Sequence, residues 1–182
     1  MMTIAIRPAR LEDTPGIAKV HVDSWRTTYK GLIADDFLAS LSYERRTQVW
    51  TEYLADPQGT SFLYVAQTDS GEIVGFVSAG SEREGNPNYR GETYAIYLLQ
   101  EVQGQGLGRK LMETAMRELC KRDFSSMLLW VLKDNLPSRK FYEAISGEYL
   151  REKSIIIGDQ NLVEVAYGWN DLPANTLTAK NA

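Results

Sequence analysis

A group of three glycines constrains this chain more than any other feature of its sequence. The turn Gln103-Gly104-Gln105-Gly106-Leu107-Gly108 follows a nearly continuous apolar run over residues 93–99, which is typical of a strand buried on both faces. After the turn, apolar residues recur at helical spacing, at Leu107, Leu111, Met112, Ala115, Met116 and Leu119. A strand, a glycine turn and a helix in this order can hold a phosphate group, because glycines let the backbone come close and a helix N-terminus attracts anions.

Two familiar phosphate-binding patterns do not fit this turn. A dinucleotide fingerprint requires Gly-x-Gly-x-x-Gly, whereas the spacing here is Gly-x-Gly-x-Gly and Arg109 stands in the place of the last glycine. A P-loop requires Gly-Lys-Ser/Thr, whereas Arg109-Lys110 follows Gly108. By itself the turn fits either a pyrophosphate-binding turn of another kind or a plain strand–helix connection.

The rest of the pattern predicts one mixed α/β domain over residues 3–171. Alternating and short apolar segments predict strands over residues 4–8, 62–66, 73–79, 93–99, 127–132, 149–157 and 162–169. Helical spacing and capping residues predict helices over residues 14–29, 35–54, 107–119 and 137–146. In the second of these helices, the expected buried residues are Phe37, Leu38, Leu41, Val49, Trp50 and Tyr53. We expect a single mixed central β-sheet flanked by helices, followed by a polar, frayed tail over residues 172–182.

Composition excludes several classes of function. A net charge of -4 and a pI of about 5.1 argue against a nucleic-acid binder, which usually carries a basic face. The single cysteine, Cys120, and the single histidine, His21, exclude an internal disulfide and most zinc sites, so we expect no metal. The N-terminus lacks the apolar stretch of a signal peptide, and no apolar run approaches the roughly 18 residues of a membrane span. We therefore expect a cytoplasmic protein without a membrane or nucleic-acid partner.

Two motifs, in the expected order, resemble those of the GNAT superfamily of N-acetyltransferases. Residues 96–108, IYLLQEVQGQGLG, resemble its Gln/Arg-x-x-Gly-x-Gly/Ala motif, which follows a hydrophobic strand. Residues 135–147, NLPSRKFYEAISG, resemble its Asn-x-x-Ala/Ser-x-x-Phe-Tyr-x-x-x-Gly motif. The resemblance spans residues 3–171, with the specific motifs inside residues 92–147. It implies the acetyltransferase fold and an enzyme that transfers an acetyl group from acetyl-CoA to an amine.

The resemblance also implies roles for individual residues. The backbone of Ile96 and Leu98 would pair with the amides of the pantetheine arm, as an added strand would, and Tyr97 between them is a further cofactor-binding residue. The pyrophosphate would lie on the turn formed by Gln103, Gly104, Gln105, Gly106, Leu107, Gly108 and Arg109. Asn135 and Ser138 would contact the pantetheine or phosphate side of acetyl-CoA. Tyr142 would donate a proton to the departing thiolate; its alternative is a core aromatic beside Phe141.

The acceptor is expected to be a primary amine of a small molecule, because no accessory domain or extended docking groove is evident. A lysine-like amine has a pKa of about 10.4, so the site must help to remove a proton. Glu92 is the candidate base, acting through water; its alternative is a solvated carboxylate at the end of a strand. Trp25 and Tyr29 would line the acceptor pocket, as this region does in the superfamily, or else pack their helix on the sheet. A non-catalytic sensor that binds acetyl-CoA is the competing function, and analogy with the superfamily also allows a homodimer.

Overall fold

The computed structural model describes residues 3–55 and 59–172. Its centre is a seven-stranded mixed sheet with the order β1-β2-β3-β4-β5-β7-β6. The strands are β1 (Ile4–Pro8), β2 (Phe62–Thr68), β3 (Ile73–Ser81), β4 (Gly91–Leu98), β5 (Met127–Leu132), β6 (Glu148–Ile157) and β7 (Gln160–Trp169). The helices are α1 (Thr14–Thr28), α2 (Asp35–Ser40), α3 (Tyr43–Ala55), α4 (Leu107–Lys121) and α5 (Leu136–Ala144). The expected mixed sheet flanked by helices is confirmed.

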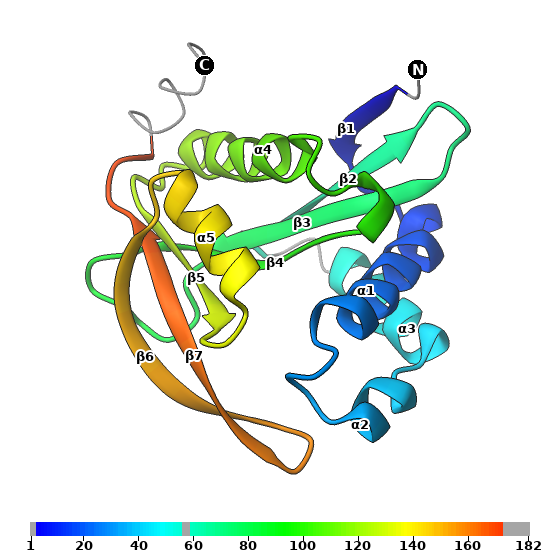
Figure 1. Cartoon of the computed structure of the whole chain (residues 1–182). Coiled ribbons are helices and arrows are strands. Elements are labelled where there is room, and N and C mark those ends of the chain that lie inside the picture. Colours follow the sequence, from blue (N-terminus) through cyan, green and yellow to red (C-terminus); the bar gives the residue numbers. More distant parts are fainter. Residues whose placement is uncertain (1–2, 56–58, 173–182) are drawn as a thin grey trace.

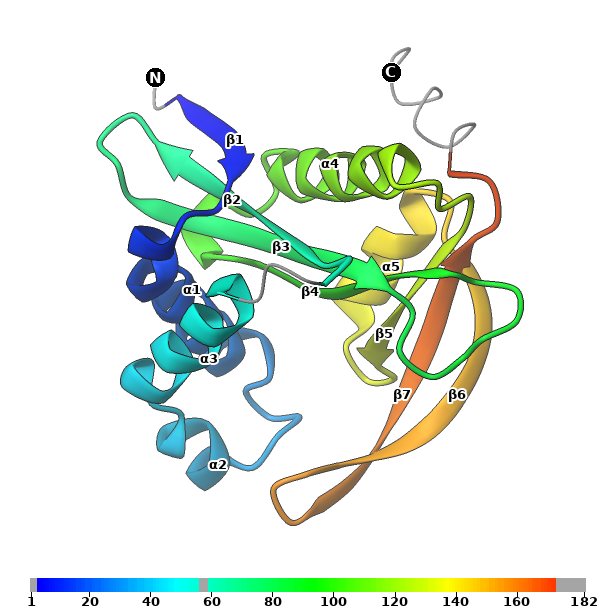
Figure 2. The same cartoon turned by 180° about the vertical axis from the view of Figure 1, so that it is seen from behind.

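The helices cover the sheet from both sides. Helices α1 and α3 lie together on one side of β3 and β4, and α4 lies on the other side (Figures 1 and 2). Every residue of the predicted apolar stripe of α4, from Leu107 to Leu119, is buried. Each such leucine or methionine contributes about 1.5–3 kcal/mol of transfer free energy, so the stripe fixes α4 on the sheet. The N-terminus of α4, with the glycine turn before it, is thereby held at the end of β4.

The segment predicted as one helix over residues 35–54 is two helices. The first, α2, ends at Ser40, and the next residue, Leu41, has an extended backbone (φ -62°, ψ 127°). The Arg26 guanidinium of α1 donates to the carbonyl oxygens of Leu38 and Leu41, which satisfies acceptors at that helix end. Of the six predicted buried residues, Leu38 and Trp50 are buried. Phe37, Leu41 and Tyr53 are partly buried and pack against the core, and the prediction was wrong for Val49, which is 49% exposed.

The C-terminal end of the domain is fixed by one further contact. Leu172 is fully buried, and its N–H donates to the carbonyl of Ser125 at 3.0 Å. The rest of the predicted frayed tail, residues 173–182, lies outside the described residues.

Candidate functional site

An opening between β4 and β5 forms the centre of the candidate site. These strands pair in parallel over only three positions, Gly91 to Thr93 with Met127 to Leu129. Over residues 94–98, the other edge of β4 pairs with no described strand and faces the opening. At its end, the Leu98 carbonyl accepts hydrogen bonds from the side chains of Ser24 and Gln103, both at 3.0 Å. This half of β4 is only half-buried, which corrects the expectation of a strand buried on both faces. An extended ligand with its own amide groups can pair with such an edge.

A bulge in β4 lies at the point where the strands diverge. Ser78 of β3 pairs with Ala95, and the next residue, Ala79, pairs with Thr93, which leaves Tyr94 as the extra residue. Bulges bend a strand and increase its local twist. The bulge therefore turns the free half of β4 away from β5 and widens the opening.

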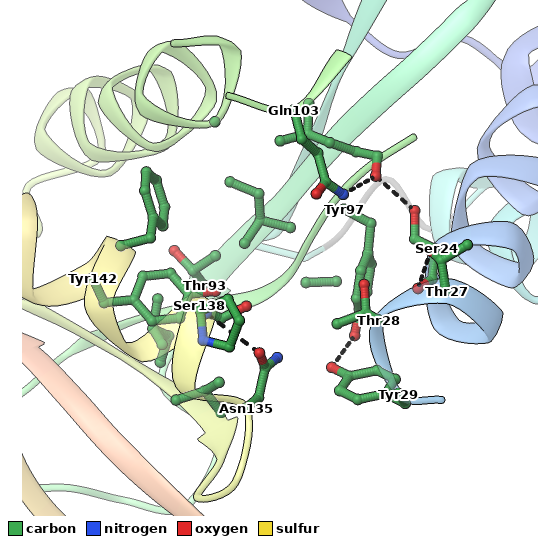
Figure 3. A pocket seen from close by; sticks show the side chains of 18 of the residues that line it. Ser24, Thr27, Thr28, Tyr29, Thr93, Tyr97, Gln103, Asn135, Ser138 and Tyr142 are labelled. Atoms are coloured by element: carbon green, nitrogen blue, oxygen red, sulfur yellow. Dashed lines mark hydrogen bonds between the residues drawn. The ribbon is translucent and has the colours of Figure 1, made fainter. Parts of the chain in front are cut away.

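A cavity of about 740 Å³ occupies this opening. Figure 3 shows Asn135, Ser138 and Tyr142 on its one side, and Tyr97 and Tyr29 on the opposite side. The predicted site residues that line the cavity are Tyr29, Ile96, Tyr97, Leu98, Gln103, Gly104, Gly106, Gly108, Arg109, Asn135, Ser138 and Tyr142. Four others do not line it, namely Trp25, Glu92, Gln105 and Leu107. Two motifs far apart in sequence thus meet at one cavity.

The glycine turn has a backbone that requires glycine. A short 3-10 helix, Gln100–Val102, precedes it, and Gly104 and Gly106 have φ of 72° and 79°. A Cβ at either position would meet no atom within 4 Å, so the requirement is conformational rather than steric, and the space beside the turn is open. Gly106 is the N-cap of α4, whose first N–H groups have no partner within the helix. The turn can therefore hold an anion at the positive end of the α4 dipole.

The second motif is positioned by a helix cap. The Asn135 side chain accepts a hydrogen bond from the Ser138 N–H at 3.3 Å, which starts α5 at the cavity wall. One turn later, Tyr142 packs against Phe141 (ring centroids 5.4 Å apart) and edge-on against Trp169 (6.4 Å). These contacts fix the ring of Tyr142 while its position faces the cavity.

The Tyr142 hydroxyl is suited to keep a proton and then to donate it. The residue is 7% exposed, and within residues 3–55 and 59–172 its hydroxyl makes no hydrogen bond. Burial, followed by the influence of Tyr97, raises the pKa of Tyr142 well above its ordinary value. The phenol is therefore neutral at physiological pH, with its O–H free for a group in the cavity.

An aromatic wall closes the opposite side of the cavity. The hydroxyls of Tyr29 and Tyr97 lie 3.4 Å apart, and burial raises the pKa of Tyr29. Trp25 packs edge-on against Tyr29 with ring centroids 4.9 Å apart, so it supports the wall from behind instead of lining the cavity. His21 stacks on Tyr97 (5.0 Å), and burial, with a smaller effect of Arg46, lowers its pKa to about 3. The imidazole is thus neutral and belongs to the support of the wall.

Glu92 does not lie where its predicted role as the base requires. Its carboxylate binds the Arg83 guanidinium at 2.5 and 3.1 Å and also accepts the Arg83 backbone N–H at 3.1 Å. The residue is 2% exposed and does not line the cavity. The carboxylate therefore faces Arg83 and not the cavity, so the structure does not support Glu92 as the base.

Sequence reasoning missed part of the cavity wall and the contact that the tip of the β6–β7 hairpin makes with α2. Thr93 of β4 and Trp130 of β5 line the cavity without belonging to either motif. The tip of the β6–β7 hairpin reaches α2 and the segment before it, where the Gln160 amide oxygen accepts the Ala34 N–H at 2.6 Å. Only strand alternation could have suggested Trp130, and no local signal predicts the position of the hairpin.

In the part of the chain that the structure describes, no helix is long and apolar enough to cross a membrane. In the same residues, no three His, Cys, Asp or Glu side chains are grouped in a way that could hold a metal ion.

Comparison with known proteins agrees with the geometry of the opening. Residues 22–147 match the acetyltransferase (GNAT) family. The uncharacterized N-acetyltransferase YuaI of Bacillus subtilis is 44% identical over 171 residues, which are 94% of this chain and 95% of that protein. An uncharacterized N-acetyltransferase of Archaeoglobus fulgidus is 32% identical, over 75% of this chain and 88% of its own. The structure of the PaiA N-acetyltransferase of Thermoplasma acidophilum in complex with coenzyme A is similar in fold, with a TM-score of 0.72, 21% identity and coverage of 89% of this chain and 98% of that one.

Proposed function

The chain belongs to the acetyltransferase (GNAT) family, and from this premise we propose that it transfers an acetyl group from acetyl-CoA to a primary amine of a small molecule, with Tyr142 as the general acid. Acetyl-CoA is the co-substrate and supplies the acetyl group as a reactive thioester. The acceptor supplies the nitrogen that forms the new amide bond.

The observation that carries this proposal is the free edge of β4 beside the glycine turn. Acetyl-CoA combines a pyrophosphate with an extended arm that contains two amides, and the opening offers one partner for each part. The open backbone at Gly104 and Gly106 suits the pyrophosphate, and the unpaired edge over residues 94–98 suits the arm. An arm laid along β4 in this way leads from the turn toward Tyr142, across the cavity from β4.

Tyr142 supplies the proton that the leaving group needs. A thiolate leaves more readily when it is protonated as the carbon–sulfur bond breaks, and a phenol with a raised pKa still holds its proton at that moment. The hydroxyl has no competing partner within the described chain, so it can turn toward the sulfur without breaking a hydrogen bond. Phe141 and Trp169 hold the ring in place, so that only the O–H bond is free to rotate.

The acceptor approaches from the side of the aromatic wall. Tyr29 and Tyr97 present two hydroxyls and two ring edges there, which suit a compact amine with an apolar part. Beyond them, the tip of the β6–β7 hairpin contacts the segment before α2. The cavity volume of about 740 Å³ lies in the range typical of small-molecule sites, which favours a small molecule as the acceptor.

The test is release of free CoA from acetyl-CoA, followed with a thiol reagent across a panel of primary amines. The panel includes polyamines, amino-acid derivatives and aminoglycosides, and binding of acetyl-CoA is measured in parallel by calorimetry. We expect tight binding of acetyl-CoA and release of CoA that depends on at least one amine. Binding without release for any amine would instead favour a sensor of acetyl-CoA and refute the proposed transfer.

A further inference from the structure

The sheet places one carboxylate, Glu164, on the face that meets the end of α1. Residues directly opposite on antiparallel strands share a face of the sheet, and Glu164 is opposite Leu132 on β5 and Lys153 on β6. Leu132 packs in a small apolar cluster with Tyr29 and Leu38. Glu164 therefore lies on the side of the sheet where the aromatic wall of the cavity stands.

Glu164 itself does not line the cavity, but Tyr29, which does, belongs to the same apolar cluster as Leu132, the residue opposite Glu164. Burial is the main cause of the raised pKa of Tyr29, and the further contributions come from Tyr97, Tyr142 and Glu164. Glu164 is half-buried, with 12% of its side chain exposed.

A primary ammonium already occupies the space in front of Glu164. The Lys153 ammonium lies 3.9 Å from the centre of the Trp130 ring, and Trp130 lines the cavity. The same ammonium lies 3.4 Å from the Glu164 carboxylate, and it makes a closer contact with the Glu84 carboxylate. A cation on an indole face beside two carboxylates is the arrangement that recognises an amine cation. Its closer contact with Glu84 lets Lys153 stay with Glu84 when Glu164 takes another partner. The Arg151 guanidinium also pairs with Glu84 and lies 5.0 Å from the centre of the Trp130 ring.

We propose that Glu164 exchanges Lys153 for the ammonium group of the acceptor and accepts its proton, with Trp130 as the supporting aromatic surface. This inference rests on the proposed acetyl transfer and assigns the base that Glu92 cannot provide. The acceptor class that follows is a primary amine that carries a positive charge at neutral pH.

The proton transfers balance over one turnover. An N–H bond of the ammonium breaks and its proton passes to the Glu164 carboxylate, which frees the nitrogen lone pair. The nitrogen bonds to the acetyl carbon, the carbon–sulfur bond breaks, and the sulfur takes the proton of Tyr142. A second proton leaves the nitrogen as the amide forms and restores the Tyr142 phenol through water. Glu164 then releases its proton to solvent, so one proton is released for each acetyl group transferred.

The surroundings of Glu164 predict how the reaction depends on pH. Its neighbours in range are Lys153 on β6, Glu84 on the loop after β3, Glu92 on β4 and Tyr29 at the end of α1. Burial raises the pKa of Glu164, while Lys153 opposes the shift. The base must be ionised to accept a proton, so the rate with an amine rises with pH through this raised pKa.

The experiment compares Glu164→Gln, Lys153→Met and a matched control, Glu152→Gln. Glu152 is the neighbouring glutamate on β6, is 42% exposed and pairs with Lys133. Initial rates are measured against pH with spermidine and n-butylamine as acceptor probes, and acetyl-CoA is varied separately. Thermal unfolding checks that each variant is folded.

We expect Glu164→Gln to lower kcat/KM for the amine by about 10²-fold, to remove the acidic limb of the pH profile and to leave the KM for acetyl-CoA unchanged. Glu152→Gln should behave as the wild type. Lys153→Met should lower the KM for the amine, because it removes the internal competitor. Unchanged kcat/KM in Glu164→Gln would overturn the inference.

The Lys153 variant provides an independent test if Glu164→Gln fails to fold. A KM for the amine that is unchanged or higher in Lys153→Met also overturns the inference. A wild-type enzyme that acetylates neither probe nor any amine of the wider panel refutes the proposed function and this inference with it. An active wild type with an unaffected Glu164→Gln variant refutes the role of Glu164 alone.

Discussion

Replacement of Tyr142 by phenylalanine should separate catalysis from stability. The hydroxyl is buried yet makes no hydrogen bond in the described chain, so its removal leaves no partner unsatisfied. We expect the free energy of unfolding to change by less than about 1 kcal/mol. The ring keeps its contacts with Phe141 and Trp169, so the binding of acetyl-CoA should persist. Loss of a general acid should lower kcat by at least about 10²-fold, equivalent to about 2.7 kcal/mol of barrier.

The assay for Tyr142→Phe is CoA release with the best amine of the panel, at saturating acetyl-CoA. Tyr149→Phe is the matched control, because it removes the same hydroxyl from a tyrosine on β6 that is 52% exposed and does not line the cavity. The control should keep wild-type kcat. If kcat of Tyr142→Phe equals that of the control, the assignment of Tyr142 as the acid is refuted.

Three further predictions follow from the same geometry. Glu92→Gln should lower the free energy of unfolding by about 1–2 kcal/mol, a loss kept small because its partner Arg83 is more than half exposed. The variant should keep kcat/KM near the wild-type value, and a loss of rate equal to that of Glu164→Gln would contradict this. Gly106→Ala should lower the free energy of unfolding by about 1 kcal/mol, because position 106 has a positive φ, and should weaken acetyl-CoA binding measured by calorimetry. Gly85 has a similar φ and open space around it but does not line the cavity, so Gly85→Ala should lower stability without changing acetyl-CoA binding. The pKa of the buried His21 is about 3 in the folded protein, against an ordinary value of 6.5. The free energy of unfolding should therefore be highest above pH 6.5, where the imidazole is neutral in both states, and this residue should lower it by about 1.4 kcal/mol per pH unit from pH 6.5 toward pH 3. Denaturant unfolding of His21→Gln should therefore show a shallower decline in this window, and parallel slopes would contradict the assignment.

The sequence predicted the parts of the fold that depend on local pattern. The apolar stripe of α4 and the cap at Asn135 are local signals, and both elements form where they were expected. The break between α2 and α3 is stabilised by Arg26, which binds the end of α2 from α1. Ser42, whose hydroxyl accepts the Arg45 N–H and so caps α3, is a local signal of this break that the prediction of one helix overlooked. The half-exposed part of β4 was missed because only the sheet pairing shows that β5 diverges after Thr93.

The site shows the same division between local and tertiary information. The glycine turn and Tyr142 carry motif signals, and both line the cavity. Glu92 was singled out by its place beside β4, but its ion pair with Arg83 forms through a loop whose course the sequence does not reveal. Glu164 has no motif signal at all, since only the pairing of β7 with β5 places it opposite Leu132, on the side of the sheet where Tyr29 lies.

The most direct test of the proposed transfer follows the acetyl group itself. The enzyme is incubated with acetyl-CoA labelled with ¹³C in the acetyl carbonyl and with the best amine of the panel, and the product is examined by NMR. We predict that the label moves from the thioester to an amide on the primary nitrogen of the acceptor, in step with the release of CoA. Label that stays in the thioester, or that appears only as free acetate, would contradict acetyl transfer to an amine at the β4–β5 opening.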